Sequence, residues 1–174
     1  MRVLLCAPHF APFFEGGTES VIRASAKELR ALGHDVLVLA GLDQVLARDQ
    51  WPGELFFVEQ LVDGIPVRFI PRLATAEGDL SEALEDMLIV RRPLALELVL
   101  QVAEEFAPAI VHVHHHAFLA GGLVAALAQE GFPVALSFHD LFLTCPRFFR
   151  VPVQRESCPP LSDVEGCATC LERD

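Results

Sequence analysis

Hydrophobic and polar residues alternate in blocks along the chain up to Asp140, a pattern typical of strands and helices that follow one another. Short apolar runs bounded by turn residues predict strands that are buried on both faces. The predicted strands are residues 3–7, 36–40, 109–114 and 133–138. Because continuous apolar runs suit parallel strands covered by helices, the pattern favours a parallel sheet.

Helical periodicity fills most of the segments between these strands. The predicted helices are residues 18–32, residues 80–106 with a break at Pro93, and residues 119–130. In the first helix, polar residues recur every three or four positions, Thr18 is the expected N-cap and Gly33 the expected stop. The segment from the first strand to the second therefore predicts a βαβ unit.

One segment breaks this alternation. Residues 55–62 and 65–70 are two β-rich runs, and Asp63-Gly64 between them is a strong hairpin signal. The expected fold class is therefore α/β, with a Rossmann-like, doubly wound and mostly parallel sheet that carries one antiparallel hairpin. In such sheets, ligands bind outside the carboxyl ends of the strands.

The character of the chain changes after Asp140, where prolines and glycine interrupt every helical or strand period. We expect one domain over residues 1–144 and a tail rich in cysteine and proline over residues 145–174. Its four cysteines are Cys145, Cys158, Cys167 and Cys170. The C-x-x-C spacing of the last two suits one tetrahedral ion, so a structural zinc ion with four thiolate ligands is one interpretation. A disulfide and unpaired thiols are the alternatives.

Charge excludes some partners. The net charge is -11, from 24 acidic and 13 basic residues, so nucleic acid and an anionic membrane surface would be repelled. No stretch approaches the roughly 20 apolar residues of an integral membrane segment. The amino terminus lacks the apolar core of a secretory signal, and we therefore expect a cytoplasmic protein.

Gly16 and Gly17 directly precede the first predicted helix. Backbone N–H groups at such a helix start can bind an anion, and glycine lets the ligand come close. The same glycines could equally serve only to turn the chain into the helix. The dinucleotide fingerprint G-x-G-x-x-G is absent at this place, so NAD and FAD are not expected.

Histidines cluster at the end of the third buried strand. Alternate residues of a strand face opposite sides, so His112 and His114 should share a face that His115 does not. This division disfavours a shared metal site. His114 and His116, which lie near the expected carboxyl edge, are the better candidates for hydrogen bonds to a substrate.

Several motifs, taken in their order and spacing, resemble the GT4 family of glycosyltransferases. They are Met1-Arg2-Val3-Leu4-Leu5, Gly16-Gly17-Thr18-Glu19, Gly33-His34-Asp35-Val36, residues 107–114, and Ser137-Phe138-His139-Asp140. The resemblance covers the chain up to its tail. It implies a GT-B fold, in which two Rossmann-like domains face each other across a cleft, and this chain matches the first of them.

The resemblance implies the N-terminal, acceptor-binding domain of a retaining glycosyltransferase that needs no cofactor for catalysis. A C-terminal domain beyond Asp174 would hold the nucleotide-sugar donor, and without it we expect no activity. A non-catalytic module of GT-B-like fold that binds a ligand or a metal is the alternative function. The acceptor is not identified by these motifs.

The resemblance also assigns residues to roles. It implies that His139 reaches the donor sugar beside the transfer centre, and that Gly16 and Gly17 close on the diphosphate and acceptor. His9 flanks the same loop. A histidine at a strand's carboxyl end can donate a hydrogen bond to a sugar hydroxyl or stabilise developing charge, although a structural histidine is an alternative. Asp140 can orient His139 or cap the next element.

Overall fold

The computed structural model describes residues 1–46, 57–73, 93–115, 119, 122–140, 158 and 165. The chain divides into two compact units, Met1–Ser137 and Phe138–Asp174. The expected boundary between residues 144 and 145 stays a prediction. Most of the tail lies outside the described residues, as does the predicted helical stretch before Pro93.

The first unit is built on one six-stranded sheet with the order β3-β4-β2-β1-β5-β6. The strands are β1 (Arg2–Ala7), β2 (Asp35–Leu46), β3 (Val58–Val62), β4 (Ile65–Leu73), β5 (Ile110–Val113) and β6 (Val134–Leu136). All neighbouring strands pair in parallel except β3 and β4, which pair antiparallel. The expected α/β fold class, with its mostly parallel sheet and antiparallel hairpin, is therefore confirmed.

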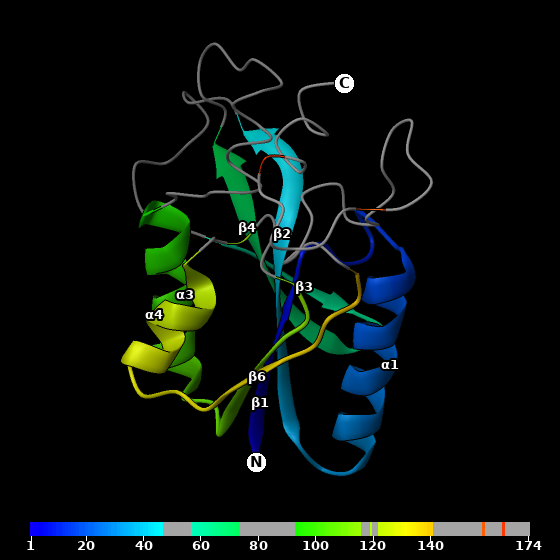
Figure 1. The fold of residues 1–174 in the computed structure, drawn as a ribbon. Coiled ribbons are helices and arrows are strands. Elements are labelled where there is room, and N and C mark those ends of the chain that lie inside the picture. Colours follow the sequence, from blue (N-terminus) through cyan, green and yellow to red (C-terminus); the bar gives the residue numbers. More distant parts are fainter. Residues whose placement is uncertain are drawn as a thin grey trace. The chain divides into compact units, whose positions relative to one another are not determined.

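Helices cover both faces of the sheet. Helix α1 (Gly17–Ala31) lies on one side, and helices α3 (Pro93–Phe106) and α4 (Leu123–Gln129) lie on the other (Figure 1). Val3, Leu5 and Ala7 of β1 belong to the core beneath α1, whereas Leu4 and Cys6 belong to the core beneath α3 and α4. Full burial of a Val or Leu side chain contributes about 1.5–3 kcal/mol, which explains why β1 is apolar at every buried position.

Cys6, the one cysteine outside the tail, lies within this core. Its side chain is fully buried, and burial raises the pKa of the Cys6 thiol to about 12. The thiolate is the reactive form of cysteine, so Cys6 is a packing residue.

Glycines follow α1 and α4 and turn the hairpin as expected, but one cap differs. Gly33 adopts a φ of 81° after α1, and Asp63 and Gly64 adopt φ values of 50° and 77° between β3 and β4. The N-cap of α1 is Gly16, so the prediction of Thr18 was wrong. The capping contact comes instead from Glu19, whose side chain reaches back to the backbone N–H of Gly16. The helix predicted over residues 119–130 begins only at Leu123 and is α4.

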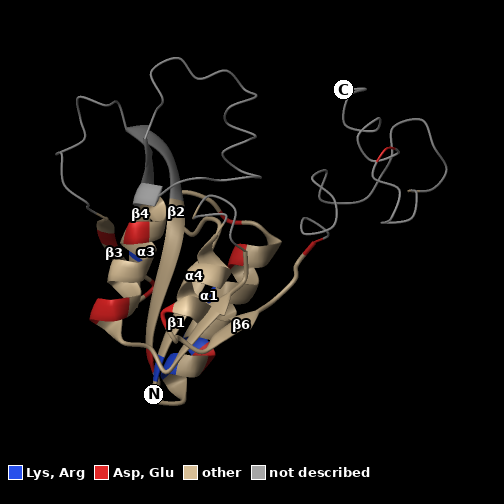
Figure 2. Ribbon diagram, turned by 60° about the vertical axis from the view of Figure 1, so that its left-hand side comes forward, with Lys and Arg blue, Asp and Glu red and all other residues tan. Residues whose placement is uncertain are grey.

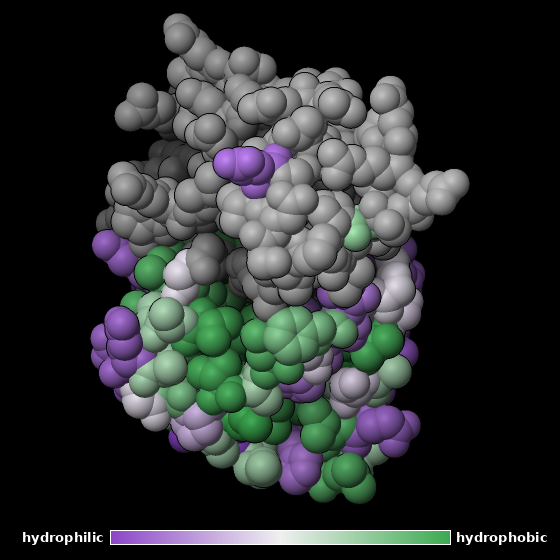
Figure 3. Space-filling model, viewed as in Figure 1, coloured by the Kyte–Doolittle hydropathy of each residue, from purple (hydrophilic) through white to green (hydrophobic). Residues whose placement is uncertain are grey.

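The described surface carries both acidic and hydrophobic residues. Figure 2 shows acidic residues at separate places on the described ribbon rather than in one patch. In the view of Figure 3, hydrophobic residues gather in the middle of the lower described surface and hydrophilic residues lie mainly around them. Among the helices formed by described residues, none combines the length and the hydropathy that crossing a membrane would need.

Candidate functional site

The order of the strands reverses between β1 and β5. From β1 the chain runs through α1 to β2 on one side, and later returns through α3 to β5 on the other side. In doubly wound sheets this reversal opens a crevice for ligands at the carboxyl ends of the two strands. The backbone N–H of His114 donates to the carbonyl of Cys6 at 2.9 Å, so the segments that leave β1 and β5 begin side by side.

The loop from β1 to α1 has a defined conformation. The carbonyl of Phe10 accepts hydrogen bonds from the N–H groups of Phe13 and Phe14, each at 3.2 Å, and the Phe10 side chain is buried. The Phe13 ring packs edge-on against Phe69 with 5.0 Å between ring centroids. The Phe14 ring lies 5.0 Å from the ring of His9, which is half-buried. These contacts fix the backbone that leads into Gly16.

The fold itself explains Gly16. Its N–H donates to Glu19 Oε2 at 3.0 Å, and Glu19 is only 4% exposed. A Cβ at position 16 would lie 2.8 Å from that carboxylate oxygen and 3.1 Å from Cε1 of Phe14. Any side chain here would therefore displace the contact that caps α1. The structural interpretation of Gly16, as a turn into the helix, is sufficient.

Gly17 has no such explanation. It is exposed, its φ is not positive, and a Cβ built on it would meet no atom of the described residues within 4 Å. Alanine has the higher helix propensity, so nothing in the described structure favours glycine over alanine here. The first turn of α1 thus leaves open space beside backbone N–H groups that have no intrahelical acceptor.

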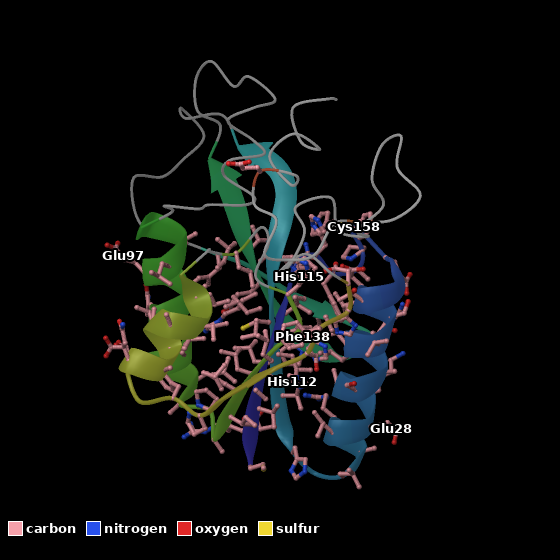
Figure 4. The ribbon with its side chains drawn as sticks, viewed as in Figure 1. Glu28, Glu97, His112, His115, Phe138 and Cys158 are labelled. Atoms are coloured by element: carbon pink, nitrogen blue, oxygen red, sulfur yellow. The ribbon has the colours of Figure 1, made fainter. Side chains whose placement is uncertain are left out.

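The histidines of β5 and of the residues directly after it are arranged as the strand alternation predicts. Figure 4 shows His112 and His115 in the region between α1 and the pair of α3 and α4. The rings of His112 and His114 are 4.0 Å apart between centroids, so they share a face. His114 and His115 are buried, with exposed fractions of 3% and 9%. His116 lies outside the described residues. His114 therefore stands at the carboxyl edge with only a small part of its surface accessible.

One partner of these histidines, Ser137, was not predicted from the sequence. Nε2 of His112 and Oγ of Ser137 are 2.8 Å apart, which joins β5 to the residue after β6. The register places Val113 opposite Leu136, and the N–H of Ser137 donates to the carbonyl of Val113 at 2.9 Å. Only the register between β5 and β6 could have revealed this contact, and local sequence patterns do not determine that register.

No metal site emerges from the part of the chain that the structure describes, where no three His, Cys, Asp or Glu residues are grouped closely enough. Of the four tail cysteines only Cys158 is described; it is half-buried and not in a disulfide. Cys145, Cys167 and Cys170 lie outside the described residues. Zinc ligation in the tail therefore stays a prediction.

His139 belongs to the second unit, two residues after Ser137, the last residue of the first unit. It is exposed and lies in a bend, and the adjacent Asp140 is half-buried. The first unit gathers His9, Gly16, Gly17 and His114 at the carboxyl edge, whereas the role of His139 stays a prediction. This arrangement offers backbone donors, histidine side chains and an open approach at Gly17 to a ligand.

A separate hollow of about 380 Å³ lies elsewhere in the first unit. Its walls include Asp35 at the start of β2, Glu59 and Leu61 of β3, and Arg68 and Phe106. Because β2 begins there, the hollow is at the opposite edge of the sheet from the loops that follow β1 and β5. It is not part of the site at the carboxyl edge.

Residues 16–160 match the family model described as the glycosyl transferase 4-like domain. The chain belongs to this family. The match begins at Gly16 and runs through the histidines of β5 and through His139, so the resemblance noted in the sequence is confirmed at the level of the family. No curated protein matches this glycosyl transferase 4-like chain.

Two solved structures resemble the domain more distantly. One, titled trehalose-6-phosphate from E. coli bound with UDP-2-fluoro glucose, is 16% identical with a TM-score of 0.47. The match covers 99% of this chain and 37% of that one, so this chain spans about a third of the length of that structure. The other is the universal stress protein from Archaeoglobus fulgidus, 12% identical with a TM-score of 0.36 over 78% of this chain and 92% of that one. At these scores, family membership rests on the sequence match.

Proposed function

We propose that this chain is the acceptor-binding, N-terminal domain of a retaining glycosyltransferase that moves a sugar from a nucleotide-sugar donor to an acceptor. The family assignment supports transfer of a sugar. The position of the loops at the reversal of the strand order supports a ligand site there. Retention means that the acceptor oxygen bonds to the sugar carbon in the configuration that the bond to phosphate had.

The observation that carries this proposal is the open space at Gly17. Glycine stands at a position where the described residues do not require it, in the first helical turn, whose backbone N–H groups have no intrahelical acceptor. Close approach of a ligand to the backbone accounts for such a glycine. A phosphate or another anionic group is favoured at this end of a helix because the dipole presents partial positive charge.

The neighbouring residues take supporting roles in the proposal. His9 and His114 flank the crevice from β1 and β5, and we assign them, with His116, hydrogen bonds to the acceptor. We assign His139 a hydrogen bond to the donor sugar beside the reacting carbon, where it stabilises charge that develops during transfer. Groups that act in this way need correct position more than an unusual pKa.

The proposal includes a second domain that holds the nucleotide. A transfer site depends on holding donor and acceptor in reacting geometry, and a domain that holds only the acceptor lacks half of that positioning. The 174-residue chain alone is therefore expected to transfer no sugar. The donor sugar enters as substrate, and no cofactor is assigned to the reaction.

The test is Gly17→Ala in the intact enzyme, meaning this chain together with its donor-binding domain. Turnover is measured as nucleoside diphosphate released from a panel of UDP-, GDP- and ADP-sugars. The added methyl group meets no atom of the part of the chain that the structure describes, so thermal stability should be unchanged or slightly higher. Because it would occupy the space assigned to the ligand, kcat/KM should fall about tenfold or more, equivalent to roughly 1.4 kcal/mol.

Ser20→Ala is the matched control, because it changes helix propensity on an exposed position of the same helix without filling the site. Its kcat/KM should stay within about twofold of the original enzyme. A Gly17→Ala enzyme with unchanged kcat/KM for every donor in the panel would contradict the proposed function.

The tail carries a separate proposal from its sequence. We assign Cys145, Cys158, Cys167 and Cys170 to one structural zinc ion, which would order a segment rich in proline. Elemental analysis of protein purified under reducing conditions without added metal should find one zinc per chain. The metal should be lost when Cys167 and Cys170 are both changed to serine, and metal-free protein with unchanged protease resistance of the tail would contradict the site.

A further inference from the structure

Arg23, in the second turn of α1, joins two segments that are distant in the sequence. Its Nη1 donates to Glu15 Oε1 at 2.5 Å, and its Nε donates to Asp63 Oδ2 at 2.9 Å. Its other terminal nitrogen, Nη2, also donates to Asp63 Oδ2. Glu15 immediately precedes the Gly16-Gly17 pair, and Asp63 lies at the turn of the β3–β4 hairpin. One guanidinium therefore contacts both the loop and the hairpin.

The hairpin end of this bridge is the anchored end. Asp63 lies in the tight β3–β4 turn, where its φ is 50° and that of Gly64 is 77°. Lys27, one turn further along α1, also donates to Asp63 Oδ2 at 2.9 Å. These hydrogen bonds, from Lys27 first and Arg23 second, hold the pKa of Asp63 below its usual range. Asp63 is therefore ionised at neutral pH.

At the loop end of the bridge, Arg23 is the one described residue that forms an ion pair with Glu15. Glu15 is about half exposed, so without a partner its side chain and the adjacent backbone would gain freedom. The contacts of Phe10, Phe13 and Phe14 fix the first part of the loop. The pair between Arg23 and Glu15 extends that order to the residue beside Gly16.

We propose that Arg23 is a positioning residue that clasps the β1–α1 loop to the hairpin turn and so holds the Gly16-Gly17 backbone in the conformation that binds the acceptor. The inference rests on the proposed function of this loop. The planar guanidinium is required because it donates in two directions at once, whereas a lysine at position 23 would offer a single point of charge.

Arg68 provides a matched control on the opposite side of the sheet. Its Nε donates to Glu59 at 2.7 Å and its Nη1 donates to Glu105 at 2.8 Å, and its side chain is 21% exposed against 28% for Arg23. Arg68 thus also bridges two carboxylates from different elements. Neither carboxylate belongs to the β1–α1 loop, so Arg68→Gln removes a similar network without touching the clasp.

The first experiment measures hydrogen exchange of the backbone N–H groups of Phe13, Phe14 and Gly16 in the intact enzyme. Arg23→Gln and Glu15→Gln should each speed this exchange about fivefold, and the double variant should go no further, because both remove the same contact. Arg68→Gln and Lys27→Gln should change it less than about twofold. Unchanged exchange in Arg23→Gln would overturn the clasp.

The second experiment connects the clasp to the reaction. With the donor that supports turnover, Arg23→Gln and Glu15→Gln should raise the acceptor KM about fivefold and leave kcat within about twofold, because lost preorganisation weakens binding. Arg23→Lys should not restore the KM. Faster exchange with an unchanged KM would overturn the positioning role. The Gly17→Ala test reports on the proposed function independently, because it leaves the clasp intact.

Discussion

Two glycine-containing turns of the first unit differ in how far the fold accounts for the glycines in them. In the β3–β4 turn, Asp63 and Gly64 have positive φ values, and the ion pairs with α1 hold the turn in place. In the β1–α1 turn, Gly16 is explained by its contacts with Glu19 and Phe14, whereas no contact among the described residues explains Gly17. The hairpin turn is thus accounted for by the fold, and the turn at the carboxyl edge is accounted for only in part.

This difference teaches how to separate structural from functional glycines. Gly64 needs a conformation that other residues avoid, so its identity follows from backbone sterics. Gly17 needs no special conformation and has no explaining contact among the described residues, so our proposal assigns its identity to a ligand. The same reasoning distinguishes the two arginine bridges, because only Arg23 contacts the loop that is incompletely explained.

The largest effect on turnover is expected from a substitution of His139, which lies three residues after the end of β6 in the sequence. It separates a functional residue from residues that the fold needs. His139 is exposed, so His139→Ala should leave thermal stability almost unchanged. Turnover in the intact enzyme should fall about 100-fold, while nucleotide affinity should change less than about threefold, because the proposed hydrogen bond is to the reacting sugar. Calorimetric titration with the nucleoside diphosphate and steady-state kinetics provide the two measurements. Near-normal turnover would remove His139 from the site.

A smaller effect of the opposite kind is expected in the hairpin turn. Gly64→Ala forces a residue with a Cβ into a φ of 77°, so the free energy of unfolding should fall by about 1–2 kcal/mol. Denaturant unfolding of the variant measures this change. The Gly17→Ala variant is the control, because it should lose no stability. If the two variants were equally destabilised, the distinction between the turns would fail.

Local patterns predicted most of the elements because they depend on neighbours in the sequence. The apolar run before Pro8 predicted β1, and the periodicity after Gly17 predicted α1. Asp63-Gly64 predicted the hairpin turn, which needs positive φ at both positions. The wrong N-cap at Thr18 and the late start of α4 show the limit of this approach at helix ends, where competing caps differ by small free energies.

The candidate site was predictable only as a set of segments. Strand alternation placed His112 and His114 on one face, which the structure confirms. The sequence also named Gly16 and Gly17 together, but could not separate them, because the reason for Gly16 is the position of two side chains. His116 and three of the tail cysteines lie outside the described residues, so their roles stay predictions.

The sequence by itself determined the α/β class, the parallel core and the family, because these follow from period, turn chemistry and the order of motifs. Only the tertiary structure decided which residues meet across long separations. Arg23 and Asp63 are 40 positions apart, and His112 and Ser137 are 25 apart. Such contacts depend on how helices and strands pack, and a local pattern carries no information about packing partners. For the same reason, the space beside Gly17 follows from the positions of the described residues and not from a local pattern.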